Sequence, residues 1–439
     1  MSYFRSGKSN ILKTRLLKNF VGGPKSYSLA VKNYNDKYIT LDIDGKQVRF
    51  NNVFLRDCSG SPKSIDSHSK QKLFSTGDIS KDLILDGSPV IRNLGTQPHL
   101  RVNWKSGLLV DHSYYSKGFL EKYSEEKLCR KGNSFLKDKQ LWSGKTIEDN
   151  SELQVEYHDY LNNEKVFAHV LDCLNKYGLC FINNVKDPLD DPDTQEYTTK
   201  NKLKWPVAEL GLKFGYIKET FYGTLFAVVS ENEALNIANT ATYLPLHMDL
   251  LYYESPPGLQ LLHFIRNSAD GGENLFADSF AAADFVKQTD PTAYEALTQY
   301  PITFQYKNNN EHYYYSRPLV VEEAFLDSAT ERPCIKEVNY SPPFQGPFEI
   351  GITSNSKYAY LFEDFLRGYR LFENYLKQPE NNYKVKMKES SCVIFDNRRT
   401  LHSRLEFKLG TKGKRFLMGA YIDGDSYRSK LRTHINKSI

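Results

Sequence analysis

The sequence predicts a mainly β protein with helices, in which a small β-rich N-terminal domain precedes a larger two-sheet sandwich or jelly roll. Strand-like runs dominate the chain after residue 220, helical insertions separate some of them, and strand and helix do not alternate regularly. The length of 439 residues allows one large and one smaller domain. Aromatic residues make up 13% of the chain, so side chains for a hydrophobic core are plentiful.

The first 35 residues are basic and contain no acidic side chain. Seven of the 58 basic residues lie there, so the remainder has 51 basic and 53 acidic residues. Leu12, Leu16 and Phe20 would share one face of a helix. Such a segment is typical of a mitochondrial presequence and predicts import into the matrix, with a disordered basic tail as the alternative. The nearly neutral remainder argues against nucleic-acid binding.

The small domain is predicted over residues 36–125. Strand-like runs flank Asp44 and Gly45, a two-residue turn signal that predicts a β-hairpin over 37–50. Residues 60–125 contain short strand-like pieces among Gly, Ser, Pro and Asn. Residues 126–154 are charged and lack hydrophobic periodicity, so we expect a linker there.

The large domain is predicted over residues 155–439. Apolar side chains recur at helical spacing in 159–177, before the stop signal Gly178, and again in 357–377. Pro291 would occupy the first position of a further helix. We expect strands at residues 179–182, 223–229, 258–265, 302–306, 335–340, 391–395 and 416–422. No run of 18 apolar residues occurs, so no transmembrane helix is predicted.

A candidate metal site lies in the extended segment around His247 and Asp249. Residues two apart in an extended chain point to the same side, so these two side chains would face one cavity. His402 follows a strong strand 155 residues later and could supply a third ligand. Two imidazoles and a carboxylate form the facial triad of non-haem Fe(II) sites. By itself the His-x-Asp pattern is weak evidence for a metal site. The chain has ten histidines, and most histidines in proteins lie on the surface or are hydrogen-bonded in the core and bind no metal.

Several motifs around these residues resemble the γ-butyrobetaine/trimethyllysine dioxygenase family, a branch of the Fe(II)/2-oxoglutarate oxygenases. Within this family, the resemblance is strongest to the Aim17-like fungal mitochondrial members. The similarity spans roughly residues 37–432. The matching segments are VFLRD at 53–57, Trp104, ETFYG at 219–223, NIA at 236–238, HMD at 247–249, PPGLQLLH at 256–263, FDNRR at 395–399, LH at 401–402 and GAYID at 419–423.

The resemblance implies a double-stranded β-helix catalytic domain that holds Fe(II) through His247, Asp249 and His402, with 2-oxoglutarate and O₂ as co-substrates and ascorbate as an accessory reductant. In this family an arginine thirteen positions after the second histidine binds the distal carboxylate of 2-oxoglutarate, and Arg415 stands there. A guanidinium suits this role because it donates two parallel hydrogen bonds to a carboxylate. Arg404 is a second candidate, and an ordinary surface arginine is the alternative for Arg415.

The resemblance also assigns substrate-binding positions. Tyr222, Phe226 and Tyr421 keep aromatic positions of a cage that attracts trimethylammonium groups by cation–π interaction, and Asn236 keeps a polar one. Two further aromatic positions fall on Asn239 and Leu250, so the cage is incomplete. We expect hydroxylation of a small betaine-like or amino-acid-derived substrate, with carnitine synthesis as one candidate pathway. The family also implies a homodimer.

Two other interpretations stay open. A catalytically silent relative that acts as a binding protein is the main alternative, although the complete triad and Arg415 argue against it. A zinc hydrolase is the other, but it would not explain Arg415.

Family members bind zinc in the small domain through three cysteines and a histidine. Those positions read Ser59, Ser61, Ser64 and Leu108 here. Serine is a poor zinc ligand beside a thiolate, so we expect no structural zinc.

Overall fold

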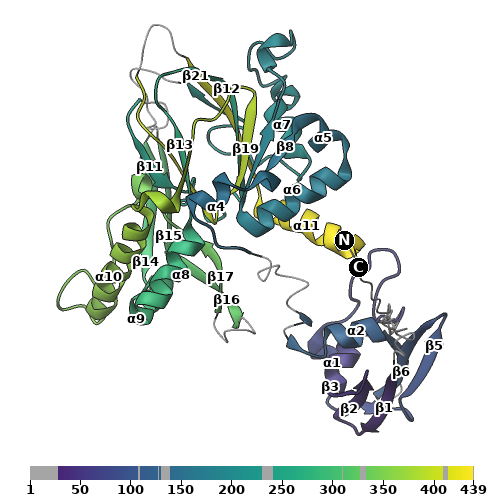
Figure 1. The fold of residues 1–439 in the computed structure, drawn as a ribbon. Coiled ribbons are helices and arrows are strands. Elements are labelled where there is room, and N and C mark those ends of the chain that lie inside the picture. Colours follow the sequence, from purple (N-terminus) through teal and green to yellow (C-terminus); the bar gives the residue numbers. More distant parts are fainter. Residues whose placement is uncertain are drawn as a thin grey trace, which may run out of the picture. The chain divides into compact units, whose positions relative to one another are not determined.

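The computed structural model describes residues 28–106, 109–126, 128–129, 139–229, 241–308, 310–326, 333–408 and 414–438. The chain divides into two compact units, which we call the N-terminal unit (Met1–Arg130) and the main unit (Lys131–Ile439). Both contain antiparallel sheets and helices, as Figure 1 shows, so the predicted mainly β class with helices is confirmed.

The N-terminal unit begins with a three-stranded antiparallel sheet, β1 (Leu29–Tyr34), β2 (Tyr38–Ile43) and β3 (Lys46–Asn51). The predicted hairpin is confirmed: β2 pairs with β3, and Asp44 and Gly45 in the turn both have positive φ angles. The predicted boundary at residue 36 is too late, because β1 lies within the basic segment 1–35 that was predicted as a presequence. Leu29 and Val31 pack against the core of this unit, which explains why the fold starts earlier.

A second sheet completes the N-terminal unit. It consists of β4 (Ile84–Leu85), β5 (Val90–Leu94), β6 (Gln97–Ser106) and β7 (Leu109–Ser116), in which β6 pairs with the other three. The helices are α1 (Asn52–Asp57), η1 (Thr76–Asp78) and α2 (Lys117–Lys122). Leu41, Leu55, Leu100, Trp104 and Leu120 are buried together and form the centre of the core.

The predicted linker over 126–154 is wrong for its second half. Residues 144–156 form α4 (Gly144–Glu148), η3 (Ser151–Leu153) and β8 (Gln154–Glu156), which belong to the main unit. Trp142, Ile147 and Leu153 are buried in its core, and the indole of Trp142 donates to the carbonyl of Tyr177 at 2.7 Å. These apolar side chains are too widely spaced to produce a periodic pattern, so no local signal in the sequence indicates their burial.

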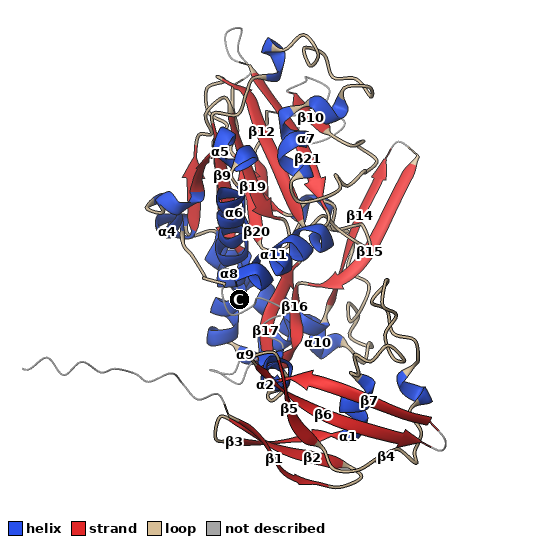
Figure 2. Ribbon diagram, turned by 90° about the vertical axis from the view of Figure 1, so that its right-hand side faces the viewer, coloured by secondary structure: helices blue, strands red, loops and turns tan. Residues whose placement is uncertain are grey.

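Two sheets organise the main unit, as the views in Figures 1 and 2 show. The six-stranded sheet has the order β10 (Phe226–Val229), β21 (Arg415–Ile422), β12 (Leu259–Asn267), β19 (Ser391–Asp396), β9 (Leu179–Asn183) and β8. The four-stranded sheet has the order β11 (Leu244–His247), β20 (Thr400–Arg404), β13 (Asn274–Asp278) and β18 (Asn382–Val385). Only the pair β8–β9 is parallel among the pairings described in these two sheets.

The inner faces of the two sheets meet through aromatic side chains. Phe276 on β13 lies 5.9 Å from Phe395 on β19 and 6.1 Å from Phe181 on β9, measured between ring centroids. His402 on β20 lies 4.9 Å from Phe395. His402 therefore projects into the space between the sheets.

Helices cover the sheets and pack on one another. On the side of the six-stranded sheet are α5 (Tyr157–Asn162), α6 (Glu164–Tyr177), α7 (Pro206–Leu212) and α11 (Gly424–Ser438); a second group consists of α8 (Ser279–Thr289), α9 (Pro291–Gln299) and α10 (Ala359–Leu376). The helix predicted over 159–177 is divided at Asn163, whose side chain caps α6, and Gly178 ends α6 with a left-handed φ of 74°. None of the helices that the structure describes has the length and apolar character needed to span a bilayer.

Two hairpins and several short helical turns complete the main unit. The hairpins are β14 (Pro301–Asn308) with β15 (Glu311–Pro318), and β16 (Val320–Leu326) with β17 (Pro333–Val338). The short turns are η4 (Pro188–Asp190), η5 (Lys202–Lys204), η7 (Pro342–Phe344) and η8 (Pro379–Asn381). In Figure 2 the hairpin β14–β15 stands beside the two larger sheets.

A buried ion pair ties the four-stranded sheet to the surrounding helices. The side chains of Arg399 and Asp278 are fully buried, and the guanidinium donates to both carboxylate oxygens at 3.0 and 2.9 Å. Arg399 also donates to the carbonyl of Lys176 at the end of α6. Since this bidentate pair is joined by further hydrogen bonds, both charges are compensated in the interior.

The buried side chain of His263 should make the stability of the main unit depend on pH. Its side chain is fully buried on β12, neither ring nitrogen has a hydrogen-bond partner among the described residues, and burial lowers its pKa to about 4. Below pH 6.5 the unfolded state therefore takes up a proton that the folded state resists, so stability falls as the pH drops from 6.5 toward 4. Between pH 7.5 and 5 the wild type should lose about 2 kcal/mol more than His263→Leu. Urea unfolding of both proteins at the two pH values measures this difference, and equal losses would contradict the assignment.

Candidate metal and co-substrate site

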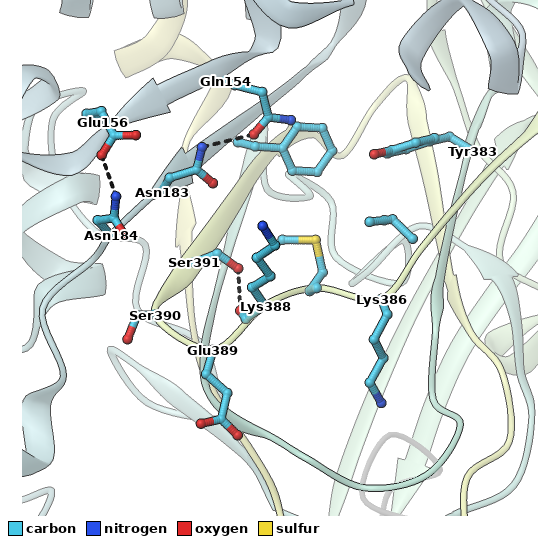
Figure 3. Close-up of a pocket in the computed structure, with 13 residues that line it drawn as sticks. Gln154, Glu156, Asn183, Asn184, Tyr383, Lys386, Lys388, Glu389, Ser390 and Ser391 are labelled. Carbon is cyan, nitrogen blue, oxygen red and sulfur yellow. Dashed lines mark hydrogen bonds between the residues drawn. The ribbon is translucent and has the colours of Figure 1, made fainter. Parts of the chain in front are cut away.

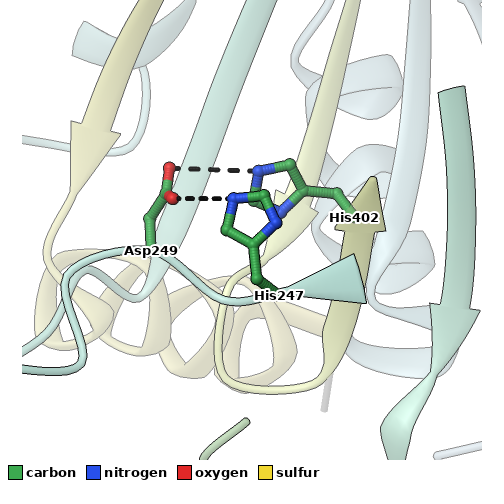
Figure 4. A group of neighbouring side chains, drawn as sticks. All are labelled: His247, Asp249 and His402. Atoms are coloured by element: carbon green, nitrogen blue, oxygen red, sulfur yellow. Dashed lines mark ion pairs between the residues drawn. The ribbon is translucent and has the colours of Figure 1, made fainter. Parts of the chain in front are cut away.

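Three side chains from distant parts of the chain converge between the sheets. Figure 4 shows the side chains of His247, Asp249 and His402 next to one another. One ligand atom from each residue lies within 4.8 Å of those of the other two. His247 ends β11, Asp249 lies two residues beyond it, and His402 on β20 is the paired residue opposite His247. Asp249 Oδ1 is 3.2 Å from His247 Nε2, and Asp249 Oδ2 is 3.9 Å from His402 Nε2. The structure thus brings together the three predicted ligand positions.

The protonation of these groups suits a metal ion. Burial, followed by the neighbouring His247, lowers the pKa of His402 to about 3, so its imidazole is neutral at physiological pH. The Nδ1 of His247 lies 2.8 Å from the carbonyl of Pro245. Because a carbonyl only accepts, Nδ1 carries the proton and Nε2 presents its lone pair to the cluster. Burial would raise the pKa of Asp249, but the two histidines and the hydroxyl of Tyr421 beside it favour the ionised carboxylate more strongly and lower that pKa.

Two buried arginines lie near one another at the same end of the sheets. Arg404 is two residues after His402 on β20, so both side chains share one face, and Arg415 begins β21. Their guanidinium groups lie 4.9 and 5.7 Å from the ring centroid of Phe407. Burial lowers the pKa of Arg404 to about 10; burial and the charge of Arg404 lower the pKa of Arg415 to about 9.

Arg415 has the properties expected of a site for an anion. Only 7% of it is exposed, its Nε has no hydrogen-bond partner, and no acidic residue pairs with it among the residues that the structure describes. A buried cation is costly unless an anion compensates it. The side chains present therefore fit the carboxylate of a small acid such as 2-oxoglutarate, while the two imidazoles and one carboxylate fit Fe(II).

The predicted substrate residues that the structure describes belong to one aromatic cluster of the main unit. Phe226 and Tyr421 stack on each other with ring centroids 4.6 Å apart, and the hydroxyl of Tyr421 donates to Asp249 Oδ2 at 2.7 Å. The ring of Phe226 passes directly over Gly419, where an added Cβ would lie 2.1 Å from it, so glycine is needed at this position. Tyr222 belongs to the same cluster, its ring centroid lies 3.9 Å from that of Phe221, and after burial and Asp249 its proximity contributes to the raised pKa of Tyr421. Asn236 and Asn239 lie outside the described residues.

The sequence did not reveal an aromatic cluster next to Tyr222. Phe221 lies 4.8 Å from Tyr306 and 5.1 Å from Tyr313, which both belong to the hairpin β14–β15. Tyr252, three residues after Asp249, lies 5.7 Å from Tyr306, and burial followed by the nearby Tyr222 raises its pKa. The tyrosine-rich run at 313–315 was the only local signal of this cluster.

The positions of the family's zinc ligands form a hydrogen-bonded network in the N-terminal unit. Ser59, Ser61 and Ser64 are buried, as are Asp111 and Ser113. Ser61 donates to Asp111 Oδ2 at 2.8 Å, and Ser113 donates to Ser59 at 2.6 Å.

Two further side chains tie into this network. Arg56 donates to Ser64 at 2.9 Å, and the indole of Trp104 donates to Ser113 at 3.0 Å. Leu108 lies outside the described residues. Hydroxyl groups already paired with one another and with a carboxylate do not fit a zinc site, which needs thiolate or imidazole ligands.

Two pockets are lined by residues other than those of the metal cluster. One, of about 460 Å³, lies in the main unit beside β8, β9 and β18 and is shown in Figure 3; its lining includes Phe181, Asn183, Tyr383 and Lys386. The other, of about 450 Å³, lies in the N-terminal unit, where Arg56, Trp104 and Asp111 line it. Neither includes His247, Asp249, His402 or Arg415.

The fold and the site together indicate the class of non-haem iron oxygenases. The main unit is mainly β and combines a His-x-Asp pair, a distant histidine and a buried arginine that follows it. Residues 142–421 match the family described as "Taurine catabolism dioxygenase TauD, TfdA family". The chain belongs to this family and is a 2-oxoglutarate-dependent dioxygenase. The resemblance stated from the motifs is thereby confirmed.

Three relatives illustrate the similarity. The chain is 31% identical to "Dioxygenase str8" of Strobilurus tenacellus, over 85% of this chain and 82% of the relative. It is 29% identical to "Probable oxidoreductase AIM17" of Saccharomyces cerevisiae, over 97% of both chains. It is 26% identical to "Gamma-butyrobetaine dioxygenase" of a Pseudomonas species, over 88% of this chain and 91% of the relative.

Proposed function

We propose that the protein is an Fe(II)- and 2-oxoglutarate-dependent hydroxylase of a small betaine-like or amino-acid-derived substrate. The observation that carries this proposal is the convergence of His247, Asp249 and His402 within 4.8 Å in the interior of the main unit. Bound Fe(II), with 2-oxoglutarate and O₂, would supply the oxidation that turns a C–H bond into C–OH and releases succinate and CO₂. The two sheets would form the double-stranded β-helix of the family.

The side chains of this site divide the work between metal and co-substrate. His247 and His402 would each offer a neutral Nε2, and Asp249 would offer a carboxylate that stays ionised. Arg415 would bind the distal carboxylate of 2-oxoglutarate, with Arg404 adding positive charge beside it. The burial of both arginines removes competing water, which strengthens this charge-assisted pairing.

The proposed substrate class rests on aromatic side chains near the metal cluster and on the relatives. One relative is named for γ-butyrobetaine and others for trimethyllysine. Tyr222, Phe226 and Tyr421 offer ring surfaces, and Asn236 a polar group, toward a substrate that carries a cation. Carnitine synthesis is the corresponding candidate pathway.

The proposed function predicts succinate formation that depends on a substrate. Purified protein with Fe(II), ascorbate and 2-oxoglutarate is incubated with a panel of betaines and amino acids, while succinate and product mass are followed. We expect one substrate to raise succinate formation and to gain one oxygen atom. If no substrate of the panel raises succinate formation in the presence of Fe(II), a catalytically silent binding protein would be favoured instead.

We expect γ-butyrobetaine to be a poor substrate in this panel. Asn239 and Leu250 stand where the complete cage has aromatic rings, and each lost cation–π contact should cost about 0.5–2 kcal/mol at a desolvated cation. A competition between γ-butyrobetaine, trimethyllysine and other betaines, read by mass spectrometry, measures this preference. Efficient and preferred turnover of γ-butyrobetaine would show that the incomplete cage is sufficient.

We also propose that the N-terminal unit contains no structural zinc, which leads to a prediction by elemental analysis. The network of Ser59, Ser61, Ser64 and Asp111 should hold this unit together without a metal. Purified protein should contain clearly less than one zinc per chain, and a strong chelator should leave the unfolding of this unit unchanged. One tightly bound zinc per chain would contradict the proposal and would point to Cys58, His68 and His112.

The proposed location is the mitochondrial matrix. The basic, acid-free composition of residues 1–35 supports it, as do relatives that are named as mitochondrial trimethyllysine dioxygenases. Fluorescent fusions of the protein with and without residues 1–27 test this targeting role. We expect the mitochondrial fluorescence to be lost in the shortened protein. The family further suggests a homodimer, which light scattering on purified protein would measure.

A further inference from the structure

Asp249 is held by its main chain as well as by its side chain. It lies beyond the last residue of β11, so no regular strand pairing fixes it. Asn397, which is fully buried, accepts a hydrogen bond from the Asp249 N–H through Oδ1 and donates to the Asp249 carbonyl through Nδ2, both at 2.9 Å. The same amide donates to the carbonyl of Pro257 at 3.3 Å. One side chain thus satisfies both main-chain polar groups of this residue.

The carboxylate of Asp249 is held by Tyr421. The phenol, in a residue that is only 3% exposed, donates to Oδ2 at 2.7 Å, and its ring is stacked on Phe226. Oδ1 faces His247 Nε2 at 3.2 Å. Because Oδ2 already accepts a strong hydrogen bond, Oδ1 is the oxygen left to face a metal ion.

The backbone after Asp249 adopts a conformation that needs such support. Leu250 has a φ of +57°, in the left-handed region that a residue with a Cβ rarely occupies. Such a conformation is sterically unfavourable and persists only where its surroundings impose it. Leu250 is buried in the core, and Asn397 fixes the peptide groups just before it.

We propose that Asn397 and Tyr421 are positioning residues that clamp Asp249 and orient Oδ1 toward the metal ion. The clamp rests on the proposed function in one respect, namely that His247, Asp249 and His402 bind a divalent metal. Groups that hydrogen-bond to metal ligands fix their orientation, and loss of one such group typically weakens metal binding about 10–100-fold. Neither residue needs to touch the substrate or 2-oxoglutarate for this role.

The test compares metal affinity with stability in matched variants of the full chain. Tyr421→Phe removes only the hydroxyl and keeps the ring, so any contact of the ring with substrate is preserved. Asn397→Ala and Asn397→Ser remove the amide.

Two variants serve as controls. Tyr160→Phe removes a buried hydroxyl that donates to the carbonyl of Leu210, and Asn382→Ala removes an amide that donates to two backbone carbonyls. Each metal-free protein is titrated with Co(II) by calorimetry, and its melting temperature is recorded.

We expect the Co(II) dissociation constant to rise about 10–100-fold in the clamp variants and to stay unchanged in the controls, whatever the melting temperatures. The KM for 2-oxoglutarate should stay near wild type while the Fe(II) concentration needed for half-maximal activity rises. Should the Asn397 variants fail to fold, Tyr421→Phe decides alone. Unchanged Co(II) affinity in a folded Tyr421→Phe would overturn the clamp, and absence of Co(II) binding in the wild type would overturn the proposed metal site itself.

Discussion

Replacement of Asp249 by alanine should abolish 2-oxoglutarate turnover without unfolding the chain. Asp249 contributes the only carboxylate of the proposed metal site, and a metal ion held by two imidazoles alone would be bound weakly and exposed to water. The loss should exceed the roughly 10–100-fold that removal of a group behind a ligand causes. Succinate formation at saturating Fe(II) measures it, and circular dichroism verifies the fold. His247→Ala and His402→Ala should behave alike.

Asp187 provides the matched control. Its side chain is 17% exposed, compared with 16% for Asp249, and it pairs with Arg266 in the same unit. Asp187→Ala therefore removes an equally buried carboxylate and its ion pair, neither of which belongs to the proposed metal or co-substrate site, so turnover should be retained. Near wild-type turnover in Asp249→Ala, together with unchanged Co(II) binding, would show that the three residues do not form the metal site.

Replacement of Arg415 by alanine should raise the KM for 2-oxoglutarate while Co(II) binding stays intact. The buried guanidinium lacks an acidic partner among the described residues, so a bound carboxylate would be its charge partner. Loss of such a charge-assisted pair should cost on the order of 2–4 kcal/mol, which corresponds to a roughly 30- to 1000-fold change. Arg415→Lys should restore only part of it, because an ammonium cannot donate two parallel bonds in one plane.

Arg404→Ala and Arg266→Ala separate the alternatives. Arg404 lies beside Arg415 and lowers its pKa, so its loss should have a smaller effect on the KM. Arg266 pairs with Asp187 at 2.5 Å, so its replacement controls for the loss of a guanidinium elsewhere. An unchanged KM in Arg415→Ala with a raised KM in Arg404→Ala would assign the carboxylate to Arg404.

Local signals in the sequence predicted those elements of the fold that short-range physics specifies. The turn at Asp44 and Gly45 needs positive φ angles, and these residue types tolerate them, so the hairpin β2–β3 was predictable. Gly178 ends α6 for the same reason. The predicted linker was partly wrong because the burial of Trp142 and Ile147 depends on helices and strands far along the chain.

The sequence by itself determined the kinds of groups at the site and their order. A histidine and an aspartate two residues apart in an extended segment point the same way, and the family's spacing marked His402 and Arg415. Only the tertiary structure decided that β11 pairs with β20, which brings His247 opposite His402. It also decided that Asn397 and Tyr421 reach Asp249, and that serines and an aspartate share one buried network in the N-terminal unit. The physical reason is that these contacts arise from strand register and sheet packing, which are set by the sum of many long-range interactions and leave no periodic mark in the local sequence.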